Sequence, residues 1–175
     1  MTPVVVHVTA DTGLFGGKDR VLLWLLVKLQ QRRLTKPVVV CFRNGLVARM
    51  YRAHGLEVDL LPMSFPFDGR AVFRLAGMLR RHGAQIVHTH DHKSHVLGRL
   101  AGRMAGVPVV STLHGLMSDA KEMSVPKRLL YGSVVRGTDF LTDRWIGVSH
   151  SLCRRLGTGR RVTYIPNGID IDMAA

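Results

Sequence analysis

Short runs of β-branched residues alternate with longer amphipathic segments along the chain, and this alternation limits the fold more than any other feature. The strand-like runs lie at residues 3–9, 37–42, 57–61, 85–89, 107–112, 144–148 and 161–165. The segments of helical period lie at about 17–33, 45–54, 69–82, 93–105, 125–137 and 150–156. Strands that alternate with helices form βαβ units. We therefore predict an α/β fold: a Rossmann-like, doubly wound, mainly parallel sheet with helices on both faces.

One domain accounts for this pattern, because 175 residues suffice for a single well-buried domain and are few for two. We assign residues 1–165 to it. The densest apolar run, residues 21–27, is far shorter than the roughly 20 residues that span a bilayer, and a strand-like run begins at once, without a secretory signal. The two cysteines, Cys41 and Cys153, offer no disulfide framework. These features predict a cytoplasmic protein.

The chain is strongly basic, with a formal net charge of +13 from 25 Lys and Arg against 12 Asp and Glu. Such an excess indicates an anionic partner, either nucleic acid, acidic lipid or a phosphorylated substrate. Pairs such as Arg32-Arg33 and Arg80-Arg81 lie near predicted helix ends, where cations also suit the helix dipole, so solvated helix ends explain the charge equally well. Nucleic acid is not expected, because no helix-turn-helix, aromatic platform or zinc spacing occurs.

The ligand site of a doubly wound sheet lies beyond the carboxyl ends of its strands. The segments that reach this edge hold most of the Gly, His and small polar residues outside the predicted helices. They are residues 10–17, 43–45, 62–68, 90–93, 114–121, 149 and 166–170. The polar chemistry is therefore expected along one rim of the domain.

Gly16 and Gly17 precede the first predicted helix. Glycines at a helix N-terminus let the backbone approach a phosphate, whose charge the free amide groups favour. The pattern is neither the dinucleotide fingerprint nor a phosphate loop, so a plain turn is the alternative. Asp19, in the first turn of that helix, has a structural alternative as well, a favourable interaction with the helix dipole.

A dense histidine group follows the fourth predicted strand. His88 and His90 can share a metal in principle, because alternate residues of a strand face the same side. Residues 88–92 lack one residue of the metallo-β-lactamase pattern, and the chain is too short for an amidohydrolase barrel. We therefore expect no metal here. His88 is expected in the core and His90 at the mouth of the strand, where it can contact substrate.

The residues next to His90 share that rim and are further candidates for substrate contact. They are Asp91, His92 and Lys93. Lys93 lies at a predicted helix start, which is unfavourable for a cation, so it is a candidate anion contact. The segment 65–75 mixes phenylalanines with Arg70 and Arg74, which indicates either an acceptor or membrane contact or a loop packed under its own aromatic residues. Lys121, Lys127 and Arg128 can extend such a surface.

Two further segments end strands. His114 follows the fifth predicted strand, and by itself predicts a turn with a half-buried imidazole. The last strand-like run ends in Pro166-Asn167-Gly168, where proline removes a ladder donor and Asn-Gly tolerates positive φ. The second pattern is typical of a strand that leaves its sheet through a turn.

Taken together, residues 16–20, 86–115, 148–149 and 164–170 resemble the N-terminal half of the retaining, two-domain (GT-B) glycosyltransferases called family 4. The usual Gly-Gly-x-Glu-Arg of that family is similar to residues 16–20, with Asp19 in place of glutamate. The resemblance implies transfer of a hexosyl unit from a nucleotide sugar to a hydroxyl of a glycan or lipid-linked acceptor. It also implies that no cofactor or essential metal takes part. The alternatives are a non-catalytic α/β ligand-binding domain and a metal-dependent hydrolase.

The resemblance also implies roles for individual residues. Gly16, Gly17 and Asp19 would lie beside the donor diphosphate. His114 would contact the transferred sugar, to position and polarise it rather than to act as general base. The acceptor side would include Arg70, His90, Asp91, His92 and Lys93.

The end of the chain has an implied role of its own. Asn167, Gly168 and Asp170 would begin the linker, residues 166–175, into a second domain that carries a Glu-x7-Glu motif and grips the donor. That motif is absent from this sequence, so we expect the chain alone to be inactive. Its surface charge further predicts reversible contact with the inner face of the cytoplasmic membrane.

Overall fold

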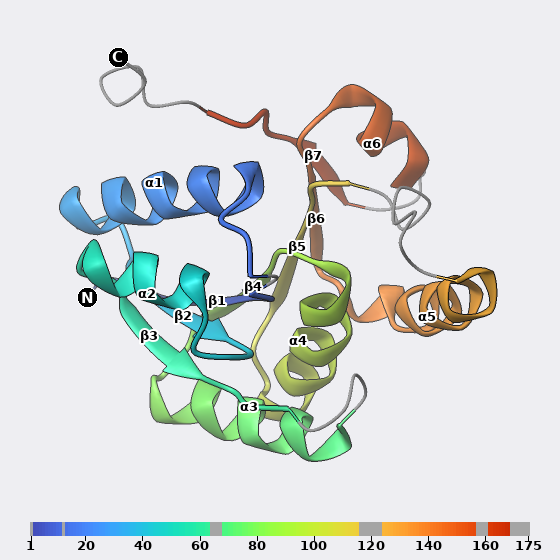
Figure 1. Ribbon diagram of the computed structural model, residues 1–175, viewed down its shortest axis with the longest axis horizontal. Helices are drawn as coiled ribbons and strands as arrows, with labels where there is room; N and C mark the ends of the chain where they lie inside the picture. Colours follow the sequence, from blue (N-terminus) through green and yellow to red (C-terminus); the bar gives the residue numbers. More distant parts are fainter. Residues whose placement is uncertain (1, 12, 64–67, 116–123, 157–160, 169–175) are drawn as a thin grey trace.

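A seven-stranded sheet, parallel throughout, forms the centre of the molecule (Figure 1). The computed structural model describes residues 2–11, 13–63, 68–115, 124–156 and 161–168. The strand order is β3-β2-β1-β4-β5-β6-β7. The strands are β1 (Val4–Thr9), β2 (Lys36–Cys41), β3 (Glu57–Leu60), β4 (Ile86–Thr89), β5 (Val109–Leu113), β6 (Arg144–Gly147) and β7 (Val162–Tyr164).

Six α-helices lie within the described residues and connect the strands, and every predicted helix and strand is present there with bounds within two residues of the prediction. The helices are α1 (Gly17–Gln31), α2 (Leu46–Ala53), α3 (Gly69–Arg81), α4 (His92–Ala105), α5 (Val125–Gly137) and α6 (His150–Leu156). A short 3-10 helix, η2 (Asp139–Leu141), was not predicted. The fold is therefore the expected doubly wound α/β fold.

Two hydrophobic cores lie on opposite faces of the sheet. Valines of β1 and β2 pack with α3 and α4 on one face, for example Val38 against Leu75. On the other face α1 and α2 cover the neighbouring β2 residues, for example Val39 against Leu26. Because alternate strand residues point to opposite faces, the continuous apolar run of β2 supplies both cores. Figure 1 shows α1 and α2 on one side of these strands and α3 and α4 on the other.

The direction of strand addition reverses between β1 and β4, which are neighbours in the sheet although about 80 residues separate them. Such a switch point opens a crevice at the carboxyl ends of the two strands. Two aspartates organise this edge. Asp91 caps α4 by accepting the Ser94 amide at 2.9 Å and also accepts the Ala10 amide at 2.6 Å. Asp11 accepts the Val47 amide at 3.2 Å and thereby caps α2 from another loop.

Helix α4 lies unusually close to the sheet. A side chain at Gly98 would collide with Thr89, and one at Gly102 would collide with Val109. From the same helix the fully buried Arg99 forms an ion pair with Asp139 at 2.9 Å and a cation–π contact with Trp145 at 4.8 Å. These contacts join α4 to η2 and β6 and so fix the strands that carry the site. Within the described residues, no helix combines the length and apolar character needed to cross a bilayer.

Candidate functional site

A cavity of about 660 Å³ lies between α1 and the strand ends β4–β6. We call the sheet face that bears it the cavity face, defined by His7, His88 and Thr112, and the opposite face, defined by Val87, Thr89 and Ser111, the packed face. Helix α1 supplies an apolar wall through residues such as Trp24 and Leu25. The strands supply a polar floor, and residues 165–168 complete the lining. The cavity thus combines apolar area with a few polar groups, as small-molecule sites do.

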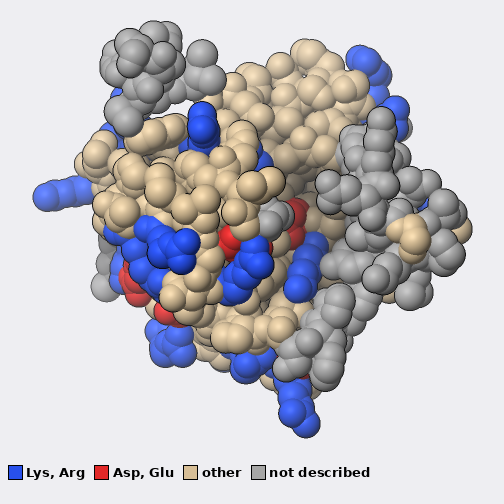
Figure 2. All heavy atoms as spheres, viewed as in Figure 1, with Lys and Arg blue, Asp and Glu red and all other residues tan. Residues whose placement is uncertain are grey.

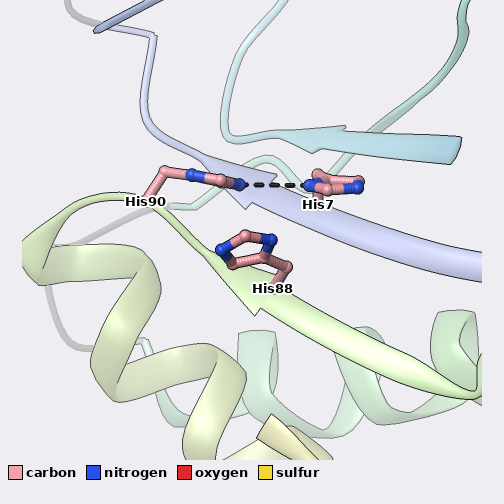
Figure 3. Close-up of side chains that lie close together, drawn as sticks. All are labelled: His7, His88 and His90. Atoms are coloured by element: carbon pink, nitrogen blue, oxygen red, sulfur yellow. Dashed lines mark hydrogen bonds between the residues drawn. The ribbon is translucent and has the colours of Figure 1, made fainter. Parts of the chain in front are cut away.

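The polar floor includes His88, His90 and His114, and strand pairing places His7 next to them. His7 of β1 is the register partner of His88 of β4, and His90 lies two residues further along the same side. In Figure 3 the three rings lie together, with His7 Nδ1 at 3.1 Å from His90 Nε2. His88 Nε2 lies 2.7 Å from Thr112 Oγ1. The ring of His114 lies 5.8 Å from that of His90, so four imidazoles form one connected group.

These imidazoles are neutral at pH 7. Burial, with a smaller contribution from His114, lowers the pKa of His88 to about 3. Burial and then the nearby Lys18 lower the pKa of His114 to about 4, although Asp91 acts in the opposite direction. Burial and neighbouring histidines also hold the pKa values of His7 and His90 well below the usual range. A neutral imidazole has one donor and one acceptor nitrogen, which suits recognition of hydroxyl groups.

Several nitrogens of this group are buried without a partner among the described residues. They are His7 Nε2, His90 Nδ1 and both ring nitrogens of His114. A buried polar atom without a hydrogen bond costs about 1–3 kcal/mol. The floor of the cavity therefore has unused hydrogen-bonding capacity that a polar ligand can satisfy.

The glycine loop precedes α1 at the same edge. The Gly16 amide donates to the Asp19 carboxylate at 3.2 Å, and that carboxylate also pairs with Lys18 at 2.9 Å. Asp19 therefore stabilises the start of α1, which is the structural alternative given for it above. Its side chain is almost fully buried. A Cβ atom placed on Gly17 would meet no described atom within 4 Å, so the fold itself does not demand glycine there. Glycine at this position leaves space for a ligand to approach the backbone.

Cations surround this edge of the sheet. Lys18 donates to Thr9 Oγ1 at 2.6 Å, and Arg43 lies 3.6 Å from the Asp11 carboxylate. The ammonium of Lys93 lies 5.1 Å from the centre of the Phe42 ring. Burial lowers the pKa of Lys93 by more than the nearby Asp91 carboxylate raises it. In the view of Figure 2, Lys and Arg side chains cover more of the surface than Asp and Glu side chains. The site is therefore suited to an anionic ligand.

The structure brings only some of the predicted site residues into the cavity. His90, His114, Asn167 and Gly168 line it. Asp91 instead caps α4. Its position at a helix start was the signal for this role.

The other predicted site residues lie outside the cavity lining. His92 begins α4, where its ring packs edge-on against His95 at 6.1 Å. Arg70 lies in the first turn of α3 and is not a lining residue. Asp170 and Lys121 lie outside the described residues, and the side chains of Lys127 and Arg128 are not among those described.

Two features of the site were missed by sequence reasoning. His7 is the main one, and its only signal was a single imidazole within the apolar run of β1. The other is the wall of the cavity formed by α1, whose residues Val21, Trp24 and Leu25 continue the apolar stripe of an ordinary core helix. Neither feature has a motif, because both depend on which strands become neighbours.

A doubly wound α/β domain whose polar groups gather at the carboxyl ends of its strands is a ligand-binding domain of the Rossmann-like class. Residues 15–173 match the family model of Glycosyltransferase Family 4, so the chain belongs to this family. The resemblance in the sequence and the expected fold class are thereby confirmed.

Similar proteins include glycosyltransferases. Over 115 residues, 62% of this chain and 29% of the relative, the sequence is 33% identical to the Escherichia coli UDP-Gal:alpha-D-GlcNAc-diphosphoundecaprenol alpha-1,3-galactosyltransferase. The structure of Anabaena HepE with UDP and glucose superposes with a TM-score of 0.76 at 17% identity, covering 98% of this chain and 46% of HepE. The lipopolysaccharide outer core galactosyltransferase WaaB superposes with a TM-score of 0.72 at 14% identity, covering 97% of this chain and 47% of WaaB. The chain thus spans less than half of the length of these relatives.

Proposed function

We propose that this chain is the acceptor-binding half of a retaining glycosyltransferase that moves a hexosyl unit from a nucleotide sugar to a hydroxyl of a cell-envelope or polysaccharide glycan. Family membership supports the reaction class. The names of the similar proteins support the substrates, because one acts on UDP-Gal and a diphosphoundecaprenol-linked sugar and another was solved with UDP and glucose. The observation that carries the proposal is the group of neutral, incompletely bonded imidazoles beside the glycine loop.

His114 is the proposed contact to the transferred sugar. Both of its ring nitrogens are buried without a partner among the described residues, and it lines the cavity. A neutral imidazole can donate to one hydroxyl and accept from another. In this proposal His114 positions and polarises the sugar, while the departing phosphate oxygen takes the proton of the acceptor hydroxyl. No metal or other cofactor is essential to this step.

The N-terminus of α1 is the proposed site of the donor diphosphate. The first amides of a helix have no partner within the helix, and the helix dipole favours an anion there. Gly17 leaves the approach open, and the Lys18 ammonium lies at the same edge. Asp19 contributes indirectly, because it holds the Gly16 amide and Lys18 in place.

The acceptor is proposed to approach the rim that carries His90, His92 and Lys93, with Arg70 further along the same edge. A lipid-linked acceptor would be met at the inner face of the cytoplasmic membrane. The charge of +13 supports reversible contact with anionic lipid, since each cation near such a surface contributes about 1 kcal/mol. No nucleic-acid partner is proposed.

A comparison of two proteins tests this function: the 175-residue chain and the same chain extended by its second domain. Both are incubated with UDP-Gal, UDP-Glc and UDP-GlcNAc and with polyprenyl-diphosphate sugars, and the anomeric configuration of the product is determined by NMR. We expect transfer with retention only by the extended protein, and unchanged transfer after treatment with a chelator. Transfer by the short chain, or an inverted product, contradicts the proposal. Binding of nucleotide sugar without transfer by the extended protein establishes a ligand-binding domain instead.

A further inference from the structure

The histidine group has a second chemical capacity, which lies deeper than the proposed sugar contact. His7, His88 and His90 each offer a ring nitrogen, and these three atoms lie within 4.8 Å of one another. Figure 3 shows the three rings converging from β1 and from the end of β4. We propose that these three residues form a binding site for a transition-metal ion of the zinc class, separate from the proposed metal-independent transfer.

The spacing of the nitrogens fits such an ion. Two imidazole nitrogens that bind one tetrahedral zinc ion at about 2.0–2.1 Å lie roughly 3.3 Å apart. His7 Nδ1 and His90 Nε2 lie 3.1 Å apart. As hydrogen-bond partners one of these atoms must carry a proton, whereas a metal ion takes the lone pair of both. His88 lies beside them, with its ring centre 4.2 Å from that of His90.

The donor set selects the kind of metal. Three uncharged nitrogen ligands suit zinc, copper, nickel or cobalt, whereas magnesium and calcium require oxygen ligands. From residues 88–92 alone we expected no metal, because that segment does not match a known metal-binding pattern. His92 begins α4 and is not part of the group, and the third imidazole comes from His7 of β1.

The surroundings supply an outer contact and an entry path. Thr112 Oγ1 can accept the Nε2 proton of His88 at 2.7 Å, which leaves His88 Nδ1 free to bind the ion. Hydrogen bonds of this kind orient metal-binding histidines in proteins. His88 and His90 both line the cavity, so an ion can reach them and keep an open position toward the cavity. The positive charge of Lys18 acts on His90 and would therefore repel a dication bound there.

Cobalt and zinc titrations of the purified 175-residue chain test the site. We expect one Co²⁺ per chain with the visible absorption of a tetrahedral complex, displacement by Zn²⁺, and a rise in Tm with Zn²⁺ concentration. His7→Gln and His90→Gln keep polar side chains and should weaken binding at least about tenfold, and Thr112→Val should weaken it by roughly 10- to 100-fold through His88. Circular dichroism and Tm without metal establish that each variant is folded.

His150→Gln is the matched control. His150 is an exposed histidine that is not one of the three proposed ligands, so this variant should bind Co²⁺ as the unchanged chain does. Absence of the tetrahedral cobalt spectrum at millimolar Co²⁺ overturns the proposal. Binding that persists in folded His7→Gln and His90→Gln but is lost in His150→Gln also overturns it, since the ion then occupies the surface. Transfer by the extended protein after chelation tests the proposed function separately, so the two proposals can fail independently.

Discussion

The two faces of β4 and β5 differ sharply, although alternate residues of the same two short strands form them. On the packed face, Thr89 bonds to Ser111 at 2.9 Å and to His95 at 2.8 Å, directly beneath α4. On the cavity face, His88 and His114 border an open volume of about 660 Å³. Thr89, Ser111 and His95 bond to one another on the packed face, whereas on the cavity face His7, His90 and His114 keep buried ring nitrogens that have no partner among the described residues. The comparison supports the proposal that one face of the central strands serves stability and the other serves ligand binding.

The largest expected effect is a difference in the free energy of unfolding between substitutions in α3, on the packed face, and in α1, beside the cavity. Leu75 of α3 is fully buried, whereas Leu25 of α1 borders the cavity and is 45% exposed. Leu75→Ala should lower the free energy of unfolding by about 2–5 kcal/mol. Leu25→Ala should change it by no more than about 0.5 kcal/mol. Urea unfolding of both variants measures the difference, and equal losses would mean that α1 is packed as tightly as α3.

A smaller effect concerns the pH dependence of a contact far from the cavity. Asp59 accepts from Arg81 at 2.7 Å and from His82 at 2.8 Å. Burial alone would raise the pKa of Asp59, but His82 and then Arg81 outweigh it and lower that pKa. Because the pKa is lower in the folded state, the stabilisation is present above the pKa of an unfolded Asp, about 3.9, and is lost as the pH falls further.

Asp59→Asn should therefore be less stable than the unchanged chain at pH 6 by up to about 1 kcal/mol, since the contact is partly exposed. The difference should shrink toward pH 3. Urea midpoints of both proteins across this range provide the measurement. A difference that stays constant with pH would show that the charge of Asp59 contributes nothing.

The sequence predicted the elements of this fold well because their signals are local. Alternation of β-branched runs and amphipathic segments located every strand and helix within two residues. Gly16, Gly17 and His114 were predicted as site residues from the family resemblance, and the structure places all three at the carboxyl edge of the sheet. Interactions between distant segments could not be predicted in this way. His7 contacts His90 across 83 residues, and Arg99 reaches Thr142 across 43.

Asp91 illustrates a different limit. Its carboxylate attracted attention as a substrate contact because it lies at the end of a strand, but it also precedes a helix with Ser94 three residues later. In the structure both carboxylate oxygens bond to backbone amides, as the second pattern predicts. Where one residue satisfies two local patterns, the contacts of the folded chain determine which applies.

Two histidines test most directly whether the cavity face serves ligand binding and the packed face serves stability. His114 lines the cavity, whereas His95 is buried on the packed face, bonded to Thr89 at 2.8 Å. In the protein extended by its second domain, His114→Ala should lower kcat by roughly 100- to 1000-fold, the usual cost of one transition-state hydrogen-bond donor, with little change in Tm. His95→Ala should lower Tm and leave the kcat of the folded enzyme within a few-fold. Near-normal turnover by His114→Ala, or a greater loss of turnover in His95→Ala, would contradict this account.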